Sequence, residues 1–472
     1  LGSHLSPAET ACYLTSDMFY VEVLLCEDGG VEDVKLAQHK EAPVVINRTP
    51  VTRTTALLLL HRLNKFEEFS VKLEHLNSLY SIPVDSETKI KLHTALRCLE
   101  KDLVKISNLP RPLKYCNPHV DTVLSGRTGK IIQWREGTPM SLKYFMCPFD
   151  LLEEKPDAED PTSGHTALVT AGVSSSLQRL PMSSLISQPP QIDTHGLPVF
   201  SELGEDNSAL LPACFIFKLN SPLPVMSSFV HKIEQVTGMG ICEGGLQKTF
   251  FPQLLLDTFV RANGCTNSWA RGDAHFVMLP ENQVHSYILS GTTDGVTELE
   301  GVLVHHIAFT HPAHVPKILD LLRHQSTFNT LLTSCIPSEE PSRDCVSDLD
   351  CEVILHCNCS ISVSFAAHDD SLALLAVNVG DYHRISCKLF PAALADPSTE
   401  EYLSRVLRRC MSIPMTMRAL CRRLRKKPFQ LHSLEVPSST SDENDTLATS
   451  VSAEADASLL TSEEGGNVHG DA

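Results

Sequence analysis

The sequence predicts an α+β fold in which antiparallel sheets are flanked by helices. Residues 351–365 alternate between apolar or Cys side chains at odd positions and mostly polar ones at even positions, a pattern typical of a strand with one buried face. The alternation resumes at 375–379 and 385–389 around a Gly-Asp turn, which favours antiparallel neighbours. Residues 92–106 instead repeat apolar side chains every four and three positions, as a helix buried on one face does.

We place an N-terminal α+β part at residues 1–152. Residues 12–25 are rich in aromatic and β-branched side chains and predict one strand, with a second at 31–37. Residues 66–80 predict a helix that pairs with the helix over 92–106, and Asp85 is the expected N-cap between them. Strands are expected again within 120–152.

Residues 153–209 have a different composition. Ser, Thr and Pro dominate and apolar periodicity is weak, which is typical of a partly disordered linker or insertion. We predict such a segment over 153–209, with one short strand near 177–180.

A strand-rich second part is predicted over 210–430. Its expected strands are 213–219, 275–280, 285–290 and 301–309, and its expected helices are 225–236 and 313–335. It ends in a basic helix. Residues 431–472 are predicted to be a disordered tail, because 438–472 contain eight acids and no base and cannot bury a core.

The charge of the chain is unevenly distributed. The net charge is −18, yet residues 405–427 hold nine Lys or Arg and no acid. Pro414 interrupts the helical spacing there, which predicts two short helices or one kinked helix. An acidic protein is unsuited to a broad nucleic-acid surface, and the longest aliphatic run, 56–60, is far shorter than the roughly 20 residues of a membrane span. We therefore expect neither nucleic acid nor membrane as a direct partner.

The end of this basic stretch has three interpretations. Its density of cations is typical of a nuclear import signal. It is also typical of a solvated helix end, where the helix dipole favours cations, and contact with nucleic acid is the third alternative. The residues of the predicted import cluster are Arg418, Arg422, Arg423, Arg425, Lys426 and Lys427.

Two groups of metal-binding residue types occur. The first is Cys351, His356, Cys357 and Cys359; the second is His305, His306, His311 and His314. Zinc needs converging ligands, usually with CxxC spacing, and a single strand sends neighbouring side chains to opposite faces. We predict core cysteines and surface or capping histidines instead.

No sequence motif points to an enzyme. The chain lacks a GxSxG elbow, a P-loop and a GxGxxG segment. We predict no catalytic, cofactor-binding or metal-binding residues and no enzymatic activity. The sixteen cysteines are scattered without a CxxC pair, which favours reduced thiols in the cytosol or nucleus.

Nuclear receptors bind short LxxLL helices in an apolar groove. This chain contains no LxxLL, and its near matches are 251–255, 318–322 and 328–332. We predict that these leucines pack in the core.

Many blocks along the chain resemble the Mediator complex subunit 1 family, in the order in which that family has them. They are CYLTSDMFYVEV at 12–23, FEEFSVKLEHLNSLYSIP at 66–83, LEKDL at 99–103, SLKYFMCPFDLLEEK at 141–155, LPACFIFKL at 211–219, HPAHVPKILDLLRHQSTFNTLL at 311–332, ISVSF at 361–365, ISCKLF at 385–390 and RCMSIPMTMRA at 409–419. Residues 44–60 and the acidic tail depart from the pattern.

The resemblance implies a non-enzymatic subunit that docks on other Mediator subunits in the middle module. It implies a nuclear protein that helps relay signals from activators to RNA polymerase II, which it contacts indirectly. In the family, receptor-binding LxxLL boxes lie beyond the ordered region. The alternatives are an independent soluble interaction adaptor unrelated to transcription, and a hydrolase whose site the sequence does not reveal.

Overall fold

The structure is a computed structural model. It describes four strands within residues 2–38, and residues 82–426 with gaps at 134–139, 149–163, 195, 242–247, 264–272, 292–298, 338–345, 357–358, 368–370, 382 and 392–395. Contacts divide the chain into two units, Leu1–Lys426 and Lys427–Ala472. The predicted helix over 66–80 and the predicted tail lie outside the described residues.

Four short strands form an antiparallel sheet at the N-terminus. They are β1 (Gly2–Leu5), β2 (Ala11–Thr15), β3 (Phe19–Leu25) and β4 (Val31–Gln38), paired in chain order. The prediction of one strand over 12–25 is wrong, because β2 and β3 pair with each other. Ser16 and Asp17 stand between them in the sequence, and both residue types favour turns.

The first long helix, α3 (Ser86–Ser107), agrees with the sequence. The Asp85 side chain accepts from the Thr88 amide at 2.9 Å and from the Thr88 hydroxyl at 2.7 Å, so the predicted N-cap is confirmed. All five apolar residues of the predicted stripe are buried: Leu92, Leu96, Leu99, Leu103 and Ile106. A shorter helix, α4 (Pro118–Ser125), follows, with Asn117 as its N-cap.

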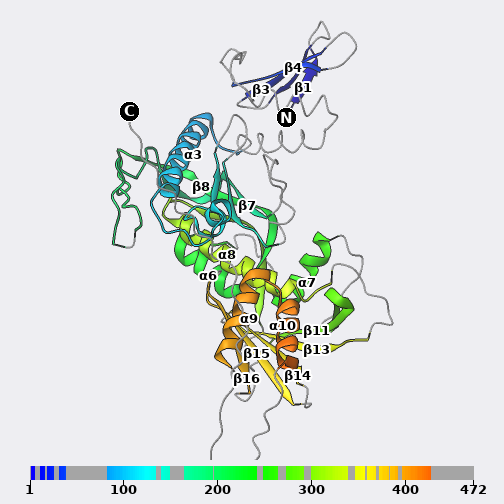
Figure 1. The fold of residues 1–472 in the computed structure, drawn as a ribbon. Coiled ribbons are helices and arrows are strands. Elements are labelled where there is room, and N and C mark those ends of the chain that lie inside the picture. The colour runs from blue at the N-terminus through cyan, green and yellow to red at the C-terminus, as the bar shows by residue number, and fades with distance from the viewer. Residues whose placement is uncertain are drawn as a thin grey trace, which may run out of the picture. The chain divides into compact units, whose positions relative to one another are not determined.

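The middle sheet has six antiparallel strands in the order β5-β6-β7-β8-β12-β9. Its centre is a long hairpin of β7 (His165–Pro181) and β8 (Ser208–Met226), visible in Figure 1. The other strands are β5 (Lys130–Ile132), β6 (Ser141–Phe145), β9 (Thr249–Phe250) and β12 (Glu300–Phe309). Helices α6 (Ser227–Thr237), α7 (Phe251–Ala262) and α8 (His314–Thr333) pack against it.

The middle sheet corrects the linker prediction. Residues 165–181 are one strand of the sheet rather than part of a linker, and the Met182 amide donates to the Asn207 carbonyl at 2.7 Å just before β8 begins. The register shifts between Val173 and Gln178, so three consecutive serines bulge opposite β8 and interrupt the alternation. The partner strand β8 begins 27 positions after β7 ends, and it supplies the pairing that local composition does not indicate.

The C-terminal sheet also has six strands, in the order β10-β11-β13-β14-β15-β16. Only β11 and β13 run parallel. Its strands are β10 (Ala274–Leu279), β11 (Gln283–Gly291), β13 (Leu349–Leu355), β14 (Ser360–Ala366), β15 (Leu372–Val379) and β16 (Ile385–Phe390); the turn η1 (Pro280–Asn282) joins β10 to β11. Helices α9 (Pro397–Cys410) and α10 (Ile413–Lys426) lie against this sheet (Figure 1).

The single strand predicted over 351–365 is a hairpin. Cys351 pairs with Phe365 and Val353 with Val363, and Cys359 has φ of 60° in the turn. Paired positions have the same parity, so odd positions face the core on both strands. The alternation of apolar and polar residues therefore continues through the turn. For this reason the sequence pattern of the hairpin is the same as that of one long strand. The predicted strands around the Gly380-Asp381 turn are confirmed as β15 and β16.

A single cluster of buried apolar side chains extends from α3 to α10. The helix α8 contacts strands of both large sheets, and His324 on α8 lies 2.7 Å from the Val379 carbonyl oxygen of β15. In the part of the chain that the structure describes, no helix combines the length and apolar character of a bilayer span.

Candidate interaction surface on the basic helix pair

The basic stretch forms two helices, as Pro414 predicts. Asp396 caps α9 by accepting from the Ser398 amide at 3.2 Å, and Pro397 occupies the first turn. The helix ends where Met411 adopts the left-handed conformation with φ of 45°. Proline is tolerated in the first turn of a helix, so Pro414 lies within the start of α10 and the break precedes it.

Side chains of α9 protect the edge of the C-terminal sheet. The Cys387 amide of β16 donates to Ser404 Oγ at 3.0 Å, and the Leu389 amide donates to Glu400 Oε1 at 3.0 Å. These amides point away from β15, so an uncovered edge would present them to another chain. The helix α9 is thereby fixed on the sheet by hydrogen bonds as well as by apolar contacts.

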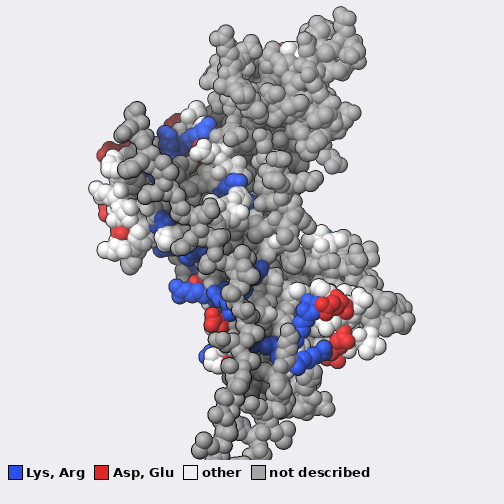
Figure 2. All heavy atoms as spheres, in the orientation of Figure 1, with Lys and Arg blue, Asp and Glu red and all other residues white. Residues whose placement is uncertain are grey.

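Two arginines of the predicted import cluster contact one carboxylate. Arg418 Nη2 lies 3.3 Å from Glu281 Oε1, and Arg422 Nη2 lies 2.5 Å from Glu281 Oε2. Arg418 also donates from Nε to Gln283 Oε1 at 3.0 Å and is buried. In Figure 2 basic and acidic side chains lie side by side at the level of α10. We call this contact the Glu281 clasp.

The clasp depends on an unusual backbone conformation. Glu281 has φ of 67° and the next residue, Asn282, has φ of 56°. Two successive residues in this region form the tight turn that hairpins prefer, but a glutamate rarely adopts it. The turn directs the carboxylate toward α10.

The electrostatics of the clasp are mutual. The hydrogen bond and positive charge of Arg422 lower the pKa of the Glu281 carboxyl, with a smaller effect from Arg418. In return, the hydrogen bond from Glu281 raises the pKa of Arg422. Both groups are therefore charged at neutral pH. Their exposure to water keeps the energetic effect of this pair small.

The structure divides the predicted import cluster. Arg423 donates to Ser398 Oγ at 2.8 Å and stacks 5.2 Å from the centre of the Tyr402 ring, whereas Arg425 is exposed. The side chain of Lys426 and all of Lys427 lie outside the described residues. The sequence places the η1 turn between two predicted strands, but it carries no signal that Glu281 and Gln283 meet α10.

The described members of the two histidine and cysteine groups are not arranged as a metal site. Cys351 and Cys359 are buried and His356 is half-buried, 2.9 Å from Ser362 Oγ; Cys357 lies outside the described residues. Among the described residues, no group of three or more His, Cys, Asp or Glu is arranged to hold a metal ion.

The prediction of surface or capping histidines agrees with the structure at His305 and His306, which are both exposed. The register of β12 shifts between Val304 and His306, and such a bulge lets consecutive side chains reach solvent.

Seven of the nine side chains at the motif positions of the near matches to LxxLL are core residues, as predicted. On α7 these are Phe251 and Leu255; on α8 they are Ile318, Leu322, Phe328, Leu331 and Leu332, and each is at most 2% exposed. The other two, Leu254 and Leu321, are half-buried. A recognition helix must leave its own domain to enter a groove, and these side chains cannot do so without opening the core.

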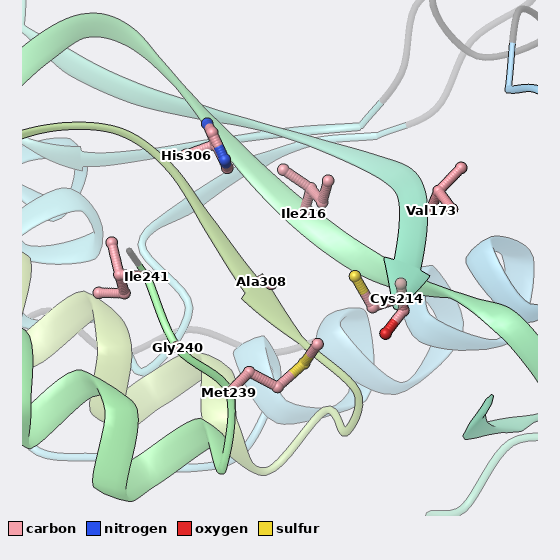
Figure 3. Close-up of a pocket in the computed structure, with 9 residues that line it drawn as sticks. Val173, Cys214, Ile216, Met239, Gly240, Ile241, His306 and Ala308 are labelled. Carbon is pink, nitrogen blue, oxygen red and sulfur yellow. The ribbon is translucent and has the colours of Figure 1, made fainter. Parts of the chain in front are cut away.

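A small hollow lies on the outer face of the middle sheet. Figure 3 shows Ile216 of β8, His306 and Ala308 of β12 and the loop residues Met239 and Ile241 around it. Its volume is about 70 Å³. Pockets for drug-sized ligands measure about 300–1,000 Å³, so this hollow suits at most one small side chain or a few waters.

The fold and this surface together define an α+β protein. Its candidate site is the pair of basic helices α9 and α10, which pack against the C-terminal sheet. The chain belongs to the Mediator subunit 1 family: the model of the family described as "Mediator of RNA polymerase II transcription subunit 1" matches residues 2–337.

Relatives with that description extend the similarity beyond residue 337. The proteins of Xenopus laevis and Xenopus tropicalis are each 36% identical over 439 residues, 90% of this chain and 27% of their own length. The protein of Drosophila melanogaster is 27% identical over 470 residues, 93% of this chain and 30% of its own. The chain thus spans about a quarter to a third of the relatives it matches.

Proposed function

We propose that this chain is a non-enzymatic subunit of the Mediator complex. It docks on other subunits in the middle module and helps relay signals from activators to RNA polymerase II. The main support for this proposal is the similarity over 90% of the chain to Mediator subunit 1 of Xenopus laevis.

The fold is suited to such a role. One buried cluster joins the middle and C-terminal sheets, so the described body can present several surfaces in fixed positions. Apolar side chains also remain exposed on it, including Leu113 at 67%, Leu177 at 64% and Leu210 at 54%. Interfaces between permanent partners are rich in such contacts. Binding of nuclear receptors by this chain is not part of the proposal, because the sequence contains no LxxLL segment.

The proposal is tested by purifying the tagged chain from nuclear extract and identifying its partners by mass spectrometry. We expect other Mediator subunits in amounts close to that of the bait. An untagged extract is the control for background binding. Recovery of the bait without them would contradict the proposal and favour the independent adaptor. Turnover in a broad hydrolase screen would contradict its non-enzymatic part.

Nuclear localisation belongs to the same proposal. Changing Arg422, Arg423, Arg425, Lys426 and Lys427 to Ala should lower nuclear accumulation of a fluorescent fusion. The matched control changes five exposed lysines elsewhere, Lys91, Lys101, Lys218, Lys317 and Lys388, to Ala, which removes the same amount of positive charge. Unchanged distribution of the first variant, or an equal loss in both, would contradict a specific import cluster.

A further inference from the structure

The helix α9 carries a row of exposed arginines that the Glu281 clasp does not use. Arg405, Arg408 and Arg409 are all exposed, whereas Leu403 and Leu407 on the opposite side are buried. Residues three and four apart are neighbours on a helix surface. We call these three arginines the α9 stripe. Because α9 is fixed to β16 through Ser404 and Glu400, the stripe is held in place on a rigid element.

The stripe differs from Arg418 and Arg422 of α10 in having no carboxylate partner among the described residues. Arg418 and Arg422 share Glu281, but among the ion pairs of the described residues none involves the stripe. The one hydrogen bond from the stripe joins Arg408 Nε to the Ser404 carbonyl at 3.2 Å. Glu401, four residues before Arg405, forms no ion pair with it in this described part.

The helix dipole at the C-terminus of α9 explains only two of the three arginines of the stripe. Arg408 and Arg409 lie in the last turn of α9, where the helix dipole favours cations. Arg405 lies before that turn, so it gains little from the dipole. Like charges three and four residues apart destabilise a helix, and a chain with 57 acids and 39 bases has many carboxylates that could offset them. The stripe is therefore unexplained by the fold alone.

We propose that the α9 stripe is an interaction surface for an acidic protein segment of a separate partner chain. Arginine binds carboxylates through paired hydrogen bonds in a fixed geometry, and Arg405 and Arg409 are separated by about 6 Å along the helix axis. A segment with Asp or Glu at similar spacing matches this arrangement. The inference goes beyond the proposed function, since it concerns direct binding by the isolated chain.

Nucleic acid fits this surface less well. Phosphate backbones are bound by broad basic faces that neutralise many phosphates. The stripe is narrow, and the exposed Glu401 lies one helical turn before Arg405. This carboxylate would repel a phosphate backbone that runs along α9, whereas a short peptide can bind without reaching it.

The test measures binding of a fluorescein-labelled tetraglutamate peptide to the purified full-length chain by fluorescence anisotropy. We expect the triple variant Arg405→Gln, Arg408→Gln, Arg409→Gln to bind about tenfold more weakly, or about 1.4 kcal/mol. The control variant, Lys91→Gln, Lys101→Gln, Lys218→Gln, removes the same charge from exposed residues elsewhere. It should bind within about twofold of the wild type, since isolated surface charges have small effects. Circular dichroism confirms that each variant folds.

Four outcomes would overturn the proposal. They are no binding of the peptide by the wild type, an equal loss in both variants, tighter binding of a 20-base-pair DNA duplex that also requires the stripe, and self-association of the chain that the stripe variant abolishes. The assay uses the purified chain alone. Failure to co-purify with Mediator therefore leaves its result unchanged, and the two proposals can fail separately.

Discussion

The two large sheets are stabilised in different ways. The C-terminal sheet depends on alternating apolar side chains, with Val353, Val363 and Leu375 all fully buried. The surroundings of the middle sheet add buried charged groups, such as Arg323, Asp102 and Asp121, each bonded to the backbone of another segment. Alternation along the sequence therefore indicates which face of a strand is buried, whereas it does not indicate the bonds by which these charged groups join segments far apart in the sequence.

Arg323 shows the second kind of contact most clearly. Its guanidinium on α8 donates to the Tyr144 carbonyl of β6 at 2.9 Å. It also donates to the carbonyls of Val123 and Gly126, at the end of α4, at 2.8 and 2.6 Å. One fully buried side chain therefore joins α8, β6 and α4. Carbonyls at a helix C-terminus attract a cation through the dipole as well as through hydrogen bonds.

The largest expected effect is that of Arg323→Met. The change removes three hydrogen bonds to buried backbone carbonyls, so we expect the free energy of unfolding to fall by about 3–5 kcal/mol. Urea unfolding followed by circular dichroism measures it. The control is Arg384→Met, whose side chain is 85% exposed and should change stability by less than about 0.5 kcal/mol. An equally small loss at Arg323 would remove the proposed role of buried charges in the middle sheet.

A second variant examines the C-terminal sheet. Leu375→Ala creates a cavity beneath β15 and should cost about 2–4 kcal/mol. Leu372→Ala, on the same strand but 75% exposed, is the matched control and should be nearly neutral. Urea unfolding followed by circular dichroism measures the free energy of unfolding of both variants. Similar losses in the two variants would show that alternation does not define the stabilised face.

Asp121 gives a pH-dependent contribution. Burial by itself raises the pKa of this carboxyl, but the ion pair with Arg111 and hydrogen bonds from the amides of Lys114 and Tyr115, at 2.7 and 3.1 Å, outweigh it. The pKa therefore lies below its usual value of about 3.9. A lowered pKa stabilises the fold above the unfolded pKa, and this stability is lost as the pH falls through the folded value.

Asp121→Asn should accordingly destabilise the protein by about 2 kcal/mol at pH 7. It should also flatten the decline of stability below about pH 4. Unfolding measured between pH 7 and pH 3 tests both effects, with Asp257→Asn as an exposed control. A variant with the same acid decline as the wild type would refute the assignment to Asp121.

The smallest expected effect is that of Glu281→Gln. Glu281 and Arg422 are exposed, and the buried Arg418 keeps its hydrogen bond to Gln283, so global stability should hardly change. Hydrogen exchange in the C-terminal turns of α10 should become faster, because the clasp no longer holds Arg418 and Arg422. Glu401→Gln on α9 serves as the control. Unchanged exchange in α10 would show that the clasp does not order this helix.

Much of the fold could be predicted from the sequence where the signal is local. The α3 stripe, the Asp85 cap, the β15–β16 turn and the helix break near Pro414 all depend on neighbours within a few residues. The hairpin over 351–365 was hidden because equal parity preserves alternation through its turn. The strand β7 was hidden because its serines bulge and its stabilising partner β8 lies far along the chain.

The candidate surface was predicted less fully. The density of basic residues identified the helix pair, but not which cations are neutralised. That outcome depends on Glu281, which is 141 positions away from Arg422, and on a turn conformation that composition does not specify. The exposed row Arg405, Arg408 and Arg409 follows from helical spacing once the buried face of α9 is known.

The most direct test of the central claim is the elution position of the tagged chain when nuclear extract is fractionated by gel filtration. If the described body docks as a Mediator subunit, the chain elutes early, together with other subunits of the complex. The destabilised Arg323→Met variant should shift away from those fractions. Elution of the folded wild-type chain as a free protein, apart from every other Mediator subunit, would contradict the account.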